Sequence, residues 1–327
     1  MKWVWVGFLM MGTALAAPEQ VFLPGVRHEY QRLNNCGPVT VGMALSYYGS
    51  DLNQYQIAPV IKPNKADKNV SPDELKAFAQ KQGFKVHMGV AGNTGTLKTL
   101  LSAGFPVMIE TWMELPEEGG MGHYRLVLGY DDAVGVFKAY DSYLGTKVTQ
   151  NYTRFDRDWQ VFNRTYLVMY PENKASEVEA LLGPRMHGGW VLKKALQVAQ
   201  AETRENPRNA YAWFNLGSTL TRLNSPKAAV KAFDQARQLG LPWRMFWYQF
   251  DAFEAYFRAG RYSDVVKLTS DVLRNAPDHE EAYYWRGRSR YQLKQPTQAR
   301  ADLQKALQYR PAFREARDIL NVWQARG

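Results

Sequence analysis

The chain has 327 residues, of which 46% are hydrophobic and 22% are charged. This balance excludes an intrinsically disordered protein, and the length favours two domains over one. Residues 190–327 hold 23 Lys and Arg against 13 Asp and Glu, whereas the first 189 residues hold 18 of each kind. The net charge of +10 therefore lies in the C-terminal part. The extra basic residues either lie on solvated helix faces or form a surface that binds an acidic partner or an anionic cell surface.

Residues 1–17 are predicted to be an export signal. Lys2 supplies a positive charge, residues 3–15 form an apolar run too short to cross a bilayer comfortably, and Ala14 and Ala16 flank a small-residue cleavage site. We therefore expect an exported protein, whether secreted, periplasmic or at the cell surface. Its single cysteine, Cys36, cannot form an internal disulfide, so the thiol is either an inert core residue or a functional group.

Residues 20–172 are predicted to form an α+β domain, with helices first and an antiparallel sheet after them. The predicted helices are 38–49, 71–83 and 96–103, and the predicted strands are 105–111, 124–130, 136–140, 147–152 and 165–170. Apolar spacing indicates the first helix, and a capping box with proline in the first turn starts the second at Ser71. Residues 173–189 contain Gly-Pro and Gly-Gly pairs and are predicted to be a linker.

Residues 190–327 contain a helical repeat. Two stretches that begin near Trp213 and Tyr283 share a pattern of small and large residues, and a degenerate copy lies between them. Pro277 and Pro311 are 34 residues apart, which is the period of the tetratricopeptide repeat (TPR). A half-repeat near residues 192–202 and a capping helix near 313–323 complete a predicted all-α solenoid.

Cys36 lies at the predicted start of the first helix, directly before Gly37 and Pro38. Unpaired amides and the helix dipole favour the thiolate at such a position. Gln31, five residues earlier, could place an amide donor beside the backbone N–H of Cys36. Two such donors would stabilise the oxyanion that forms when sulfur attacks a carbonyl carbon.

His123 opens one predicted strand and Asp141 ends the next. If Tyr130 pairs near Val136 in this hairpin, Arg125 faces Asp141, and His123 is its diagonal neighbour on the same sheet face, roughly 7–8 Å away. Asp141 could then orient His123, which would act as the general base for Cys36. The other histidines fit this role less well (His28, His87, His187 and His279), whereas Asp132 is an alternative to Asp141.

The segments 31–49, 122–131 and 140–141 resemble the double-glycine (bacteriocin-leader) peptidase-like branch of the papain-like cysteine peptidases. The resemblance covers about residues 20–172. It implies a papain-like fold in which Cys36 is the nucleophile, His123 the base and Asp141 its orienting carboxylate, with Gln31 at the oxyanion hole. The best-known members carry transporter domains and cut leader peptides in the cytoplasm, so the export signal argues against the same substrate.

Two loops and the repeats suggest how substrates could be selected. Residues 114–122, which lead into His123, have glycines that suit a mobile lid and acids that could prefer cationic substrate residues, but a plain solvent loop is an equal alternative. Residues 62–69 are polar and are predicted to lie at the surface and not in the site. Aromatic and Arg side chains are frequent interface anchors, and the repeat register places several on the inner helices: Arg222, Trp247, Arg258, Tyr284 and Arg288. No cofactor, metal site or nucleic-acid partner is expected, because the sequence lacks their ligand sets and motifs.

The sequence therefore predicts an α+β papain-like cysteine peptidase domain followed by an all-α TPR solenoid. The expected function is that of an exported cysteine peptidase whose TPR module recruits a substrate or a protein partner. Two alternatives remain. The chain could be a catalytically silent TPR scaffold, or it could use the same triad as an amidase acting on cell-wall peptides.

Overall fold

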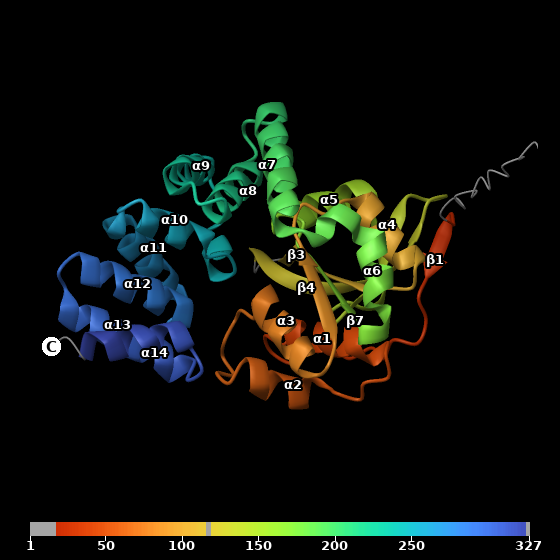
Figure 1. Cartoon of the computed structure of the whole chain (residues 1–327), viewed down its shortest axis with the longest axis horizontal. Coiled ribbons are helices and arrows are strands. Elements are labelled where there is room, and N and C mark those ends of the chain that lie inside the picture. Colours follow the sequence, from red (N-terminus) through yellow and green to blue (C-terminus); the bar gives the residue numbers. More distant parts are fainter. Residues whose placement is uncertain (1–17, 116–118, 325–327) are drawn as a thin grey trace, which may run out of the picture.

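The computed structural model describes residues 18–115 and 119–324, which form an α+β domain and a curved helical solenoid (Figure 1). The predicted export signal, residues 1–17, lies outside the described residues. Within the described part of the chain, no helix is both long and apolar enough to cross a membrane.

The α+β domain is built on one antiparallel sheet. Its strands are β1 Gln20–Phe22, β2 Lys85–Gly89, β3 Val107–Leu115, β4 Gly119–Asp131, β5 Val136–Asp141, β6 Gly145–Asn151 and β7 Tyr166–Tyr170. They follow the order β2-β7-β3-β4-β5-β6, and β1 pairs with the end of β4. Each strand predicted between residues 105 and 170 is present, with ends that differ by a few residues.

Helices from both halves of the domain pack around this sheet. They are α1 Cys36–Ser46, α2 Gln54–Ile61, α3 Pro72–Lys81, α4 Thr94–Ser102, α5 Tyr152–Gln160 and α6 Ala175–Leu182. α1, α2 and α3 contact one another and lie together beside the sheet (Figure 1). Every residue of α1 from Gly37 to Leu45 is buried, so this helix is held from all sides. The predicted capping box at Ser71 and Glu74 is confirmed.

Two sequence predictions about connecting segments were wrong. The expected lid at residues 114–122 is largely strand, because β3 and β4 continue to pair as far as Leu115 and Gly119; residues 116–118 lie outside the described residues. The expected linker at residues 173–189 is mostly helical. It contains α6, whose Val178 and Leu182 are buried in the core of the α+β domain. Burial of these two side chains outweighs the helix-breaking effect of the nearby glycines and proline.

The solenoid consists of antiparallel helix pairs, as the repeat predicted. Its elements are α7 Gly188–Glu205, α8 Ala210–Arg222, α9 Pro226–Gln238, η3 Trp243–Trp247, α10 Asp251–Arg258, α11 Tyr262–Asn275, α12 Glu280–Gln292, α13 Pro296–Tyr309 and α14 Arg314–Gln324. Gly217 of α8 is required for this packing, because a Cβ there would come within 2.8 Å of the Phe233 ring. The degenerate middle copy has a short first helix, α10, preceded by the 3-10 turn η3.

The two domains share a hydrophobic core. Trp112, Val161 and Phe162 belong to the α+β domain, yet they pack in one buried cluster with solenoid residues such as Phe214 and Phe246. Polar contacts at the end of α5 reinforce this junction. Asn209 and Asn215 donate to the Gln160 side chain and backbone at 3.0 and 2.7 Å.

The solenoid curves so that its C-terminal end also reaches the α+β domain (Figure 1). Arg310 forms an ion pair with Glu74 of α3 at 2.7 Å, and its other terminal nitrogen lies 3.5 Å from Glu281. Asp278 accepts from Asn64 and pairs with Lys68 at 3.2 Å. The two domains therefore contact each other at both ends of the solenoid, which restricts their relative motion.

Buried carboxyl groups at this second contact predict a pH-dependent stability. Burial first, and then the charges of Glu74 and Asp67, raise the pKa of Glu281 to about 8, although Arg310 opposes the shift. Because this pKa is above the value of about 4.3 in the unfolded chain, the folded state keeps a proton that the unfolded chain loses above about pH 4.3. The stability that Glu281 contributes is therefore fully present below about pH 4.3 and is lost as the pH rises from there to about 8.

We therefore expect the melting temperature of Glu281→Gln to fall less between pH 5 and pH 8 than that of the unmodified protein. Thermal denaturation at a series of pH values measures this difference. Glu315→Gln on α14 is the control, since it removes an exposed carboxylate. Parallel curves for the unmodified protein and Glu281→Gln would contradict the prediction.

Candidate active site

Cys36 is the first residue of α1 and is half-buried. No side chain caps this end of the helix, so the amides of the first turn point toward the sulfur side of the site. The ring of His123 and the backbone N–H groups of Tyr124 and Gly37 lie against the thiol and lower its pKa, in opposition to its burial. The structure thus brings together the sulfur and the imidazole that the sequence predicted to meet.

His123 and Asp141 lie on neighbouring strands, β4 and β5. Arg125 is directly opposite Asp141, which is the predicted register, and His123 is the diagonal neighbour. A bulge between Val127 and Gly129 is needed for this, because Tyr130 pairs with Phe137 and not with Val136 as expected. His123 Nε2 is 2.9 Å from Asp141 Oδ1, which leaves Nδ1 of the ring for Cys36.

The electrostatics of the three groups favour a thiolate–imidazolium pair. Burial opposes ionisation of Cys36, but the hydrogen bond and the charge of His123 lower the pKa of the thiol below its usual value. Burial also disfavours charged His123, but the hydrogen bonds to Asp141 and Cys36 raise its pKa to about 9. Burial raises the pKa of Asp141, but the hydrogen bond and charge of His123, followed by Arg125, hold it well below the usual range.

Asp141 is completely buried, and each of its oxygens has donors. Oδ1 accepts from the backbone N–H groups of Tyr143 and Leu144 at 2.7 and 2.9 Å, besides His123. Oδ2 accepts from Arg125 Nε at 2.7 Å. Arg125 is itself buried, and sequence reasoning used it only as a marker of strand register. A buried arginine opposite a carboxylate on the next strand is the signal that could have indicated its role.

Gln31 lies beside Cys36 in the same cleft. Its Oε1 accepts from Ser142 Oγ at 2.7 Å, and its backbone N–H donates to Ser142 O at 2.8 Å. Because the amide oxygen is occupied, the Nε2 donor is the end of the side chain that remains for a ligand in the cleft. This placement fits the predicted role at an oxyanion hole.

The segment before Cys36 is held by Gln54, which begins α2 and was not noticed in the sequence. Gln54 is buried, and its Nε2 donates to Glu29 Oε1 and to Tyr30 O, both at 2.8 Å. Its Oε1 accepts from the backbone N–H of Arg32 at 2.7 Å and from Asn35 Nδ2 at 2.9 Å. The single side chain of Gln54 therefore holds the loop that carries Gln31 in place.

Comparison with known families identifies both parts of the chain. Residues 23–170 match the Peptidase_C39 like family, and residues 192–240 and 280–313 match the tetratricopeptide repeat. Residues 23–170 form a C39-like peptidase domain. TPR repeats follow it, and the degenerate copy between the two matched stretches is the one that contains η3 and α10.

Solved structures and curated sequences were also compared. A protein named as a C39-like peptidase of Bacillus anthracis is 18% identical, with 47% of this chain and 99% of that chain covered and a TM-score of 0.39. The peptidase domain of Streptococcus ComA, a bi-functional ABC transporter, is 16% identical, covering 46% of this chain and 100% of that chain with a TM-score of 0.37. Aryl-hydrocarbon-interacting protein-like 1 of Bos taurus is 27% identical over 112 residues, which are 32% of this chain. The chain spans about a third of the length of that relative.

The cleft of the C39-like domain is completed by the TPR solenoid. A cavity of about 390 Å³ is lined by Cys36 and His123. Its walls also include Trp247, the last residue of η3, and Tyr248, which follows η3. Tyr248 packs against Gly122, where a Cβ would come within 3.0 Å of both Phe162 and Tyr248. Glycine at this position thus lets the solenoid approach the residue next to His123.

The other predicted interface residues lie away from Cys36. Arg258, Tyr284 and Arg288 line a groove of about 820 Å³ between the solenoid and α3, whereas Arg222 forms an ion pair with Asp251 at 3.2 Å. Trp247 was expected on the inner face of the repeats, but the structure places it in the wall of the peptidase cleft. The reason is that η3 replaces the first turn of a repeat helix.

The alternative residues have other partners. Asp132 lies at the far end of the hairpin and accepts from Tyr152 at 2.6 Å. His87 contacts Tyr166 Oη at 3.3 Å, and His28 contacts the backbone oxygen of Asp141 at 2.9 Å. His279 lies at the domain contact, 3.0 Å from Trp247 O, and His187 precedes α7. Among the described residues, no group of His, Cys, Asp and Glu is placed to hold a metal ion.

Proposed function

We propose that this protein is an exported cysteine peptidase that cleaves peptide bonds with Cys36, His123 and Asp141. The single observation that carries the proposal is the contact of the Cys36 thiol at the start of α1 with a histidine whose other nitrogen binds a buried carboxylate. The match of residues 23–170 to the Peptidase_C39 like family supports it.

The proposed reaction has two steps. The Cys36 thiolate attacks the substrate carbonyl carbon, and Gln31 Nε2 and the Cys36 N–H donate to the resulting oxyanion. His123 then gives its proton to the leaving amine, and an acyl-thioester remains on Cys36. In the second step, neutral His123 takes a proton from water, the hydroxide attacks the thioester, and the acid product leaves. The thiolate and the imidazolium are thereby restored.

The export and recruitment parts of the proposal rest on the sequence and the repeats. Residues 1–17 have the composition of an export signal. TPR repeats are protein-interaction modules, and here we propose that they bring a protein substrate or partner to the cleft. The excess of basic residues in the solenoid half would favour an acidic partner or an anionic cell surface.

Incubation of residues 18–327 with a peptide library and, separately, with purified cell wall tests the proposal. Mass spectrometry would identify new amino termini, and Cys36→Ser is the control because it keeps the size of the side chain. We expect cleavage of library peptides that Cys36→Ser abolishes. Products from the cell wall alone would instead indicate an amidase, and no products from either would leave a silent TPR scaffold.

A further inference from the structure

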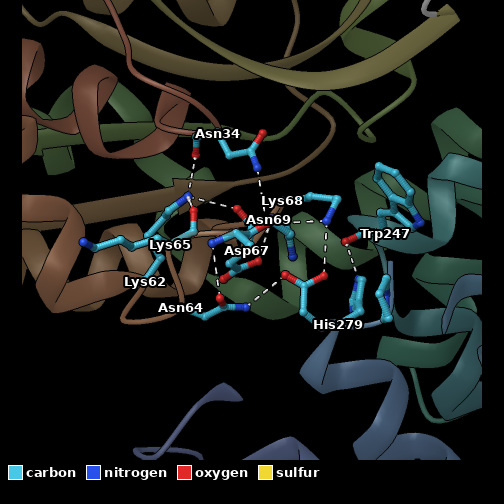
Figure 2. Close-up of polar contacts among 12 residues, drawn as sticks. Asn34, Lys62, Asn64, Lys65, Asp67, Lys68, Asn69, Trp247 and His279 are labelled. Atoms are coloured by element: carbon cyan, nitrogen blue, oxygen red, sulfur yellow. Dashed lines mark hydrogen bonds and ion pairs between the residues drawn. The ribbon is translucent and has the colours of Figure 1, made fainter. Parts of the chain in front are cut away.

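Lys62 is a buried lysine close to the catalytic loop. It follows α2 directly and is only 3% exposed. Its ammonium donates to three backbone carbonyl oxygens, those of Asn34 and Lys65 at 3.2 Å and that of Asp67 at 2.9 Å (Figure 2). The sequence had suggested that this stretch, residues 62–69, was an ordinary surface loop.

This arrangement uses every donor of the side chain. An ammonium has three N–H groups and no acceptor, and three carbonyls match them. A buried charge without a carboxylate partner costs free energy, so we look for a function that it serves. Burial lowers the pKa of Lys62, while the charges of Asp67 and Cys36 act in the opposite direction.

The carbonyl of Asn34 connects Lys62 to the nucleophile. Asn34 lies two residues before Cys36 and has a left-handed backbone, with φ at 57°. Asparagine adopts this conformation more readily than other residues with a side chain, and it directs the Asn34 carbonyl to Lys62. Lys62 supplies a hydrogen bond to the carbonyl, and Asn34 Nδ2 donates to Ala66 O at 3.3 Å. With Gln54 at the start of α2, both ends of this helix hold the loop of Gln31 and Cys36.

The TPR solenoid contacts residues 64–69, the segment that supplies two of the three carbonyl acceptors of Lys62. Asp278, in the turn before α12, accepts from Asn64 Nδ2 at 3.1 Å and pairs with Lys68 at 3.2 Å. Lys68 also lies 5.9 Å from the centre of the Trp247 ring in the cleft wall. Figure 2 shows these contacts as one continuous network from Asn34 through Lys62 and residues 64–69 to the solenoid.

We propose that Lys62 is a positioning residue for Cys36. Lys62 fixes the Asn34 carbonyl, and its positive charge favours the thiolate. Asp278 of the solenoid keeps Lys62 in place. In consequence, the thiol chemistry of the C39-like domain depends on the docked solenoid. This inference rests on the proposed function of Cys36, and the experiment separates the two.

Several titratable groups face the two residues in question. Those that act on Lys62 are Asp67, Cys36, Asp278 and Lys68. Those that interact electrostatically with Cys36 are His123, Lys62, Glu110, Tyr124 and Tyr248. Burial, followed by the charge of Cys36, raises the pKa of Glu110 well above its usual value, which favours the neutral carboxyl. His123 and Lys62 are the members of this set whose charged form is positive, and the cavity that contains Cys36 also has Arg32, Lys68 and Arg244 in its walls.

The test is the rate at which iodoacetamide alkylates Cys36 as a function of pH, which requires no substrate. Lys62→Met keeps the length of the side chain but removes its charge and donors. We expect alkylation at pH 6 to be several-fold slower, because the thiolate is the reactive form and loses a nearby positive charge. Lys65 has an exposed side chain and contributes only its backbone carbonyl to the network. Lys65→Met is therefore expected to leave the rate unchanged. Lys62→Gln, which keeps two donors without the charge, replaces Lys62→Met if the latter does not fold.

The solenoid side is tested with Asp278→Ala, and Asp271→Ala on α11 serves as the control. We expect the former to slow alkylation at pH 6 and the latter to have no effect. An unchanged rate in Lys62→Met would overturn the role of Lys62, and an unchanged rate in Asp278→Ala would overturn the dependence on the solenoid. Slow alkylation at pH 6 in the unmodified protein would instead reject the proposed function itself.

Discussion

Replacing His123 by alanine is expected to lower the rate of peptide hydrolysis by about 10²- to 10⁴-fold, the usual contribution of general acid–base catalysis. His123 is the group in hydrogen-bonding contact with the Cys36 thiol, and its nitrogen Nε2 is held by Asp141. Without the ring, the thiol loses the strongest of the interactions that lower its pKa, and the leaving amine loses its proton donor. Steady-state kinetics on a cleaved library peptide measures the loss.

Two controls make this result specific. His87→Gln removes a buried histidine that contacts Tyr166 on another part of the sheet, and we expect it to keep most of the activity. Added imidazole should partly restore hydrolysis by His123→Ala, because a small base can enter the space that the ring leaves. Retention of more than a tenth of the activity in His123→Ala would show that another residue serves as the base.

Asp141→Asn is expected to impair both catalysis and stability. The carboxylate accepts from His123 and from two backbone amides through Oδ1, and from Arg125 through Oδ2. An amide in its place cannot neutralise Arg125, which is 6% exposed. Leaving one partner of a buried ion pair uncompensated costs about 3–5 kcal/mol, which urea denaturation would detect. Turnover should fall by about 10²-fold or more, because His123 loses the group that orients and stabilises its charged form.

The double variant Arg125→Met/Asp141→Asn separates the two effects. Removing the uncompensated guanidinium should restore much of the free energy of unfolding, whereas the activity should stay low. If activity returned together with stability, Asp141 would have only a structural role, and the proposed triad would be reduced to a pair.

Local sequence signals were sufficient to find the candidate residues Cys36, His123 and Asp141, because each lies at a point where secondary structure begins or ends. Gly37 and Pro38 after Cys36 indicated the start of α1, and the two strands around residues 131–135 indicated a hairpin. Strand pairing then placed Asp141 beside His123, and the structure confirmed the pairing of Arg125 with Asp141. The bulge at residue 128 was not predictable, because register shifts of one residue depend on packing against the rest of the sheet.

Helix α2 escaped prediction for a physical reason. Pro59 lies inside it, and proline normally breaks a helix of this kind. The capping box of Asn53 and Gln56 was the available signal, and it would have indicated where the helix starts. Without α2, neither Gln54 nor Lys62 could be connected with the loop of Cys36.

Contacts between the domains could not be read from local patterns. Trp247 had the spacing of an inner repeat helix, but η3 interrupts that helix and directs the residue to the peptidase cleft. The shared core around Trp112 and Phe162 likewise depends on segments far apart in the chain, because these two residues pack with Phe214 of the solenoid. Such long-range packing overrides the repeat register, and a single sequence carries no periodic signal for it.

The pH profile of Cys36 alkylation by iodoacetamide, measured from pH 4 to pH 10 on the unmodified protein and on His123→Ala, decides whether the two groups form an ion pair. We predict fast alkylation of the unmodified protein already near pH 6, with a second rise near pH 9, where His123 loses its proton. His123→Ala should show a single rise near the ordinary thiol pKa of about 8.5. A single rise near pH 8.5 in both proteins would contradict the thiolate–imidazolium pair on which the proposed peptidase depends.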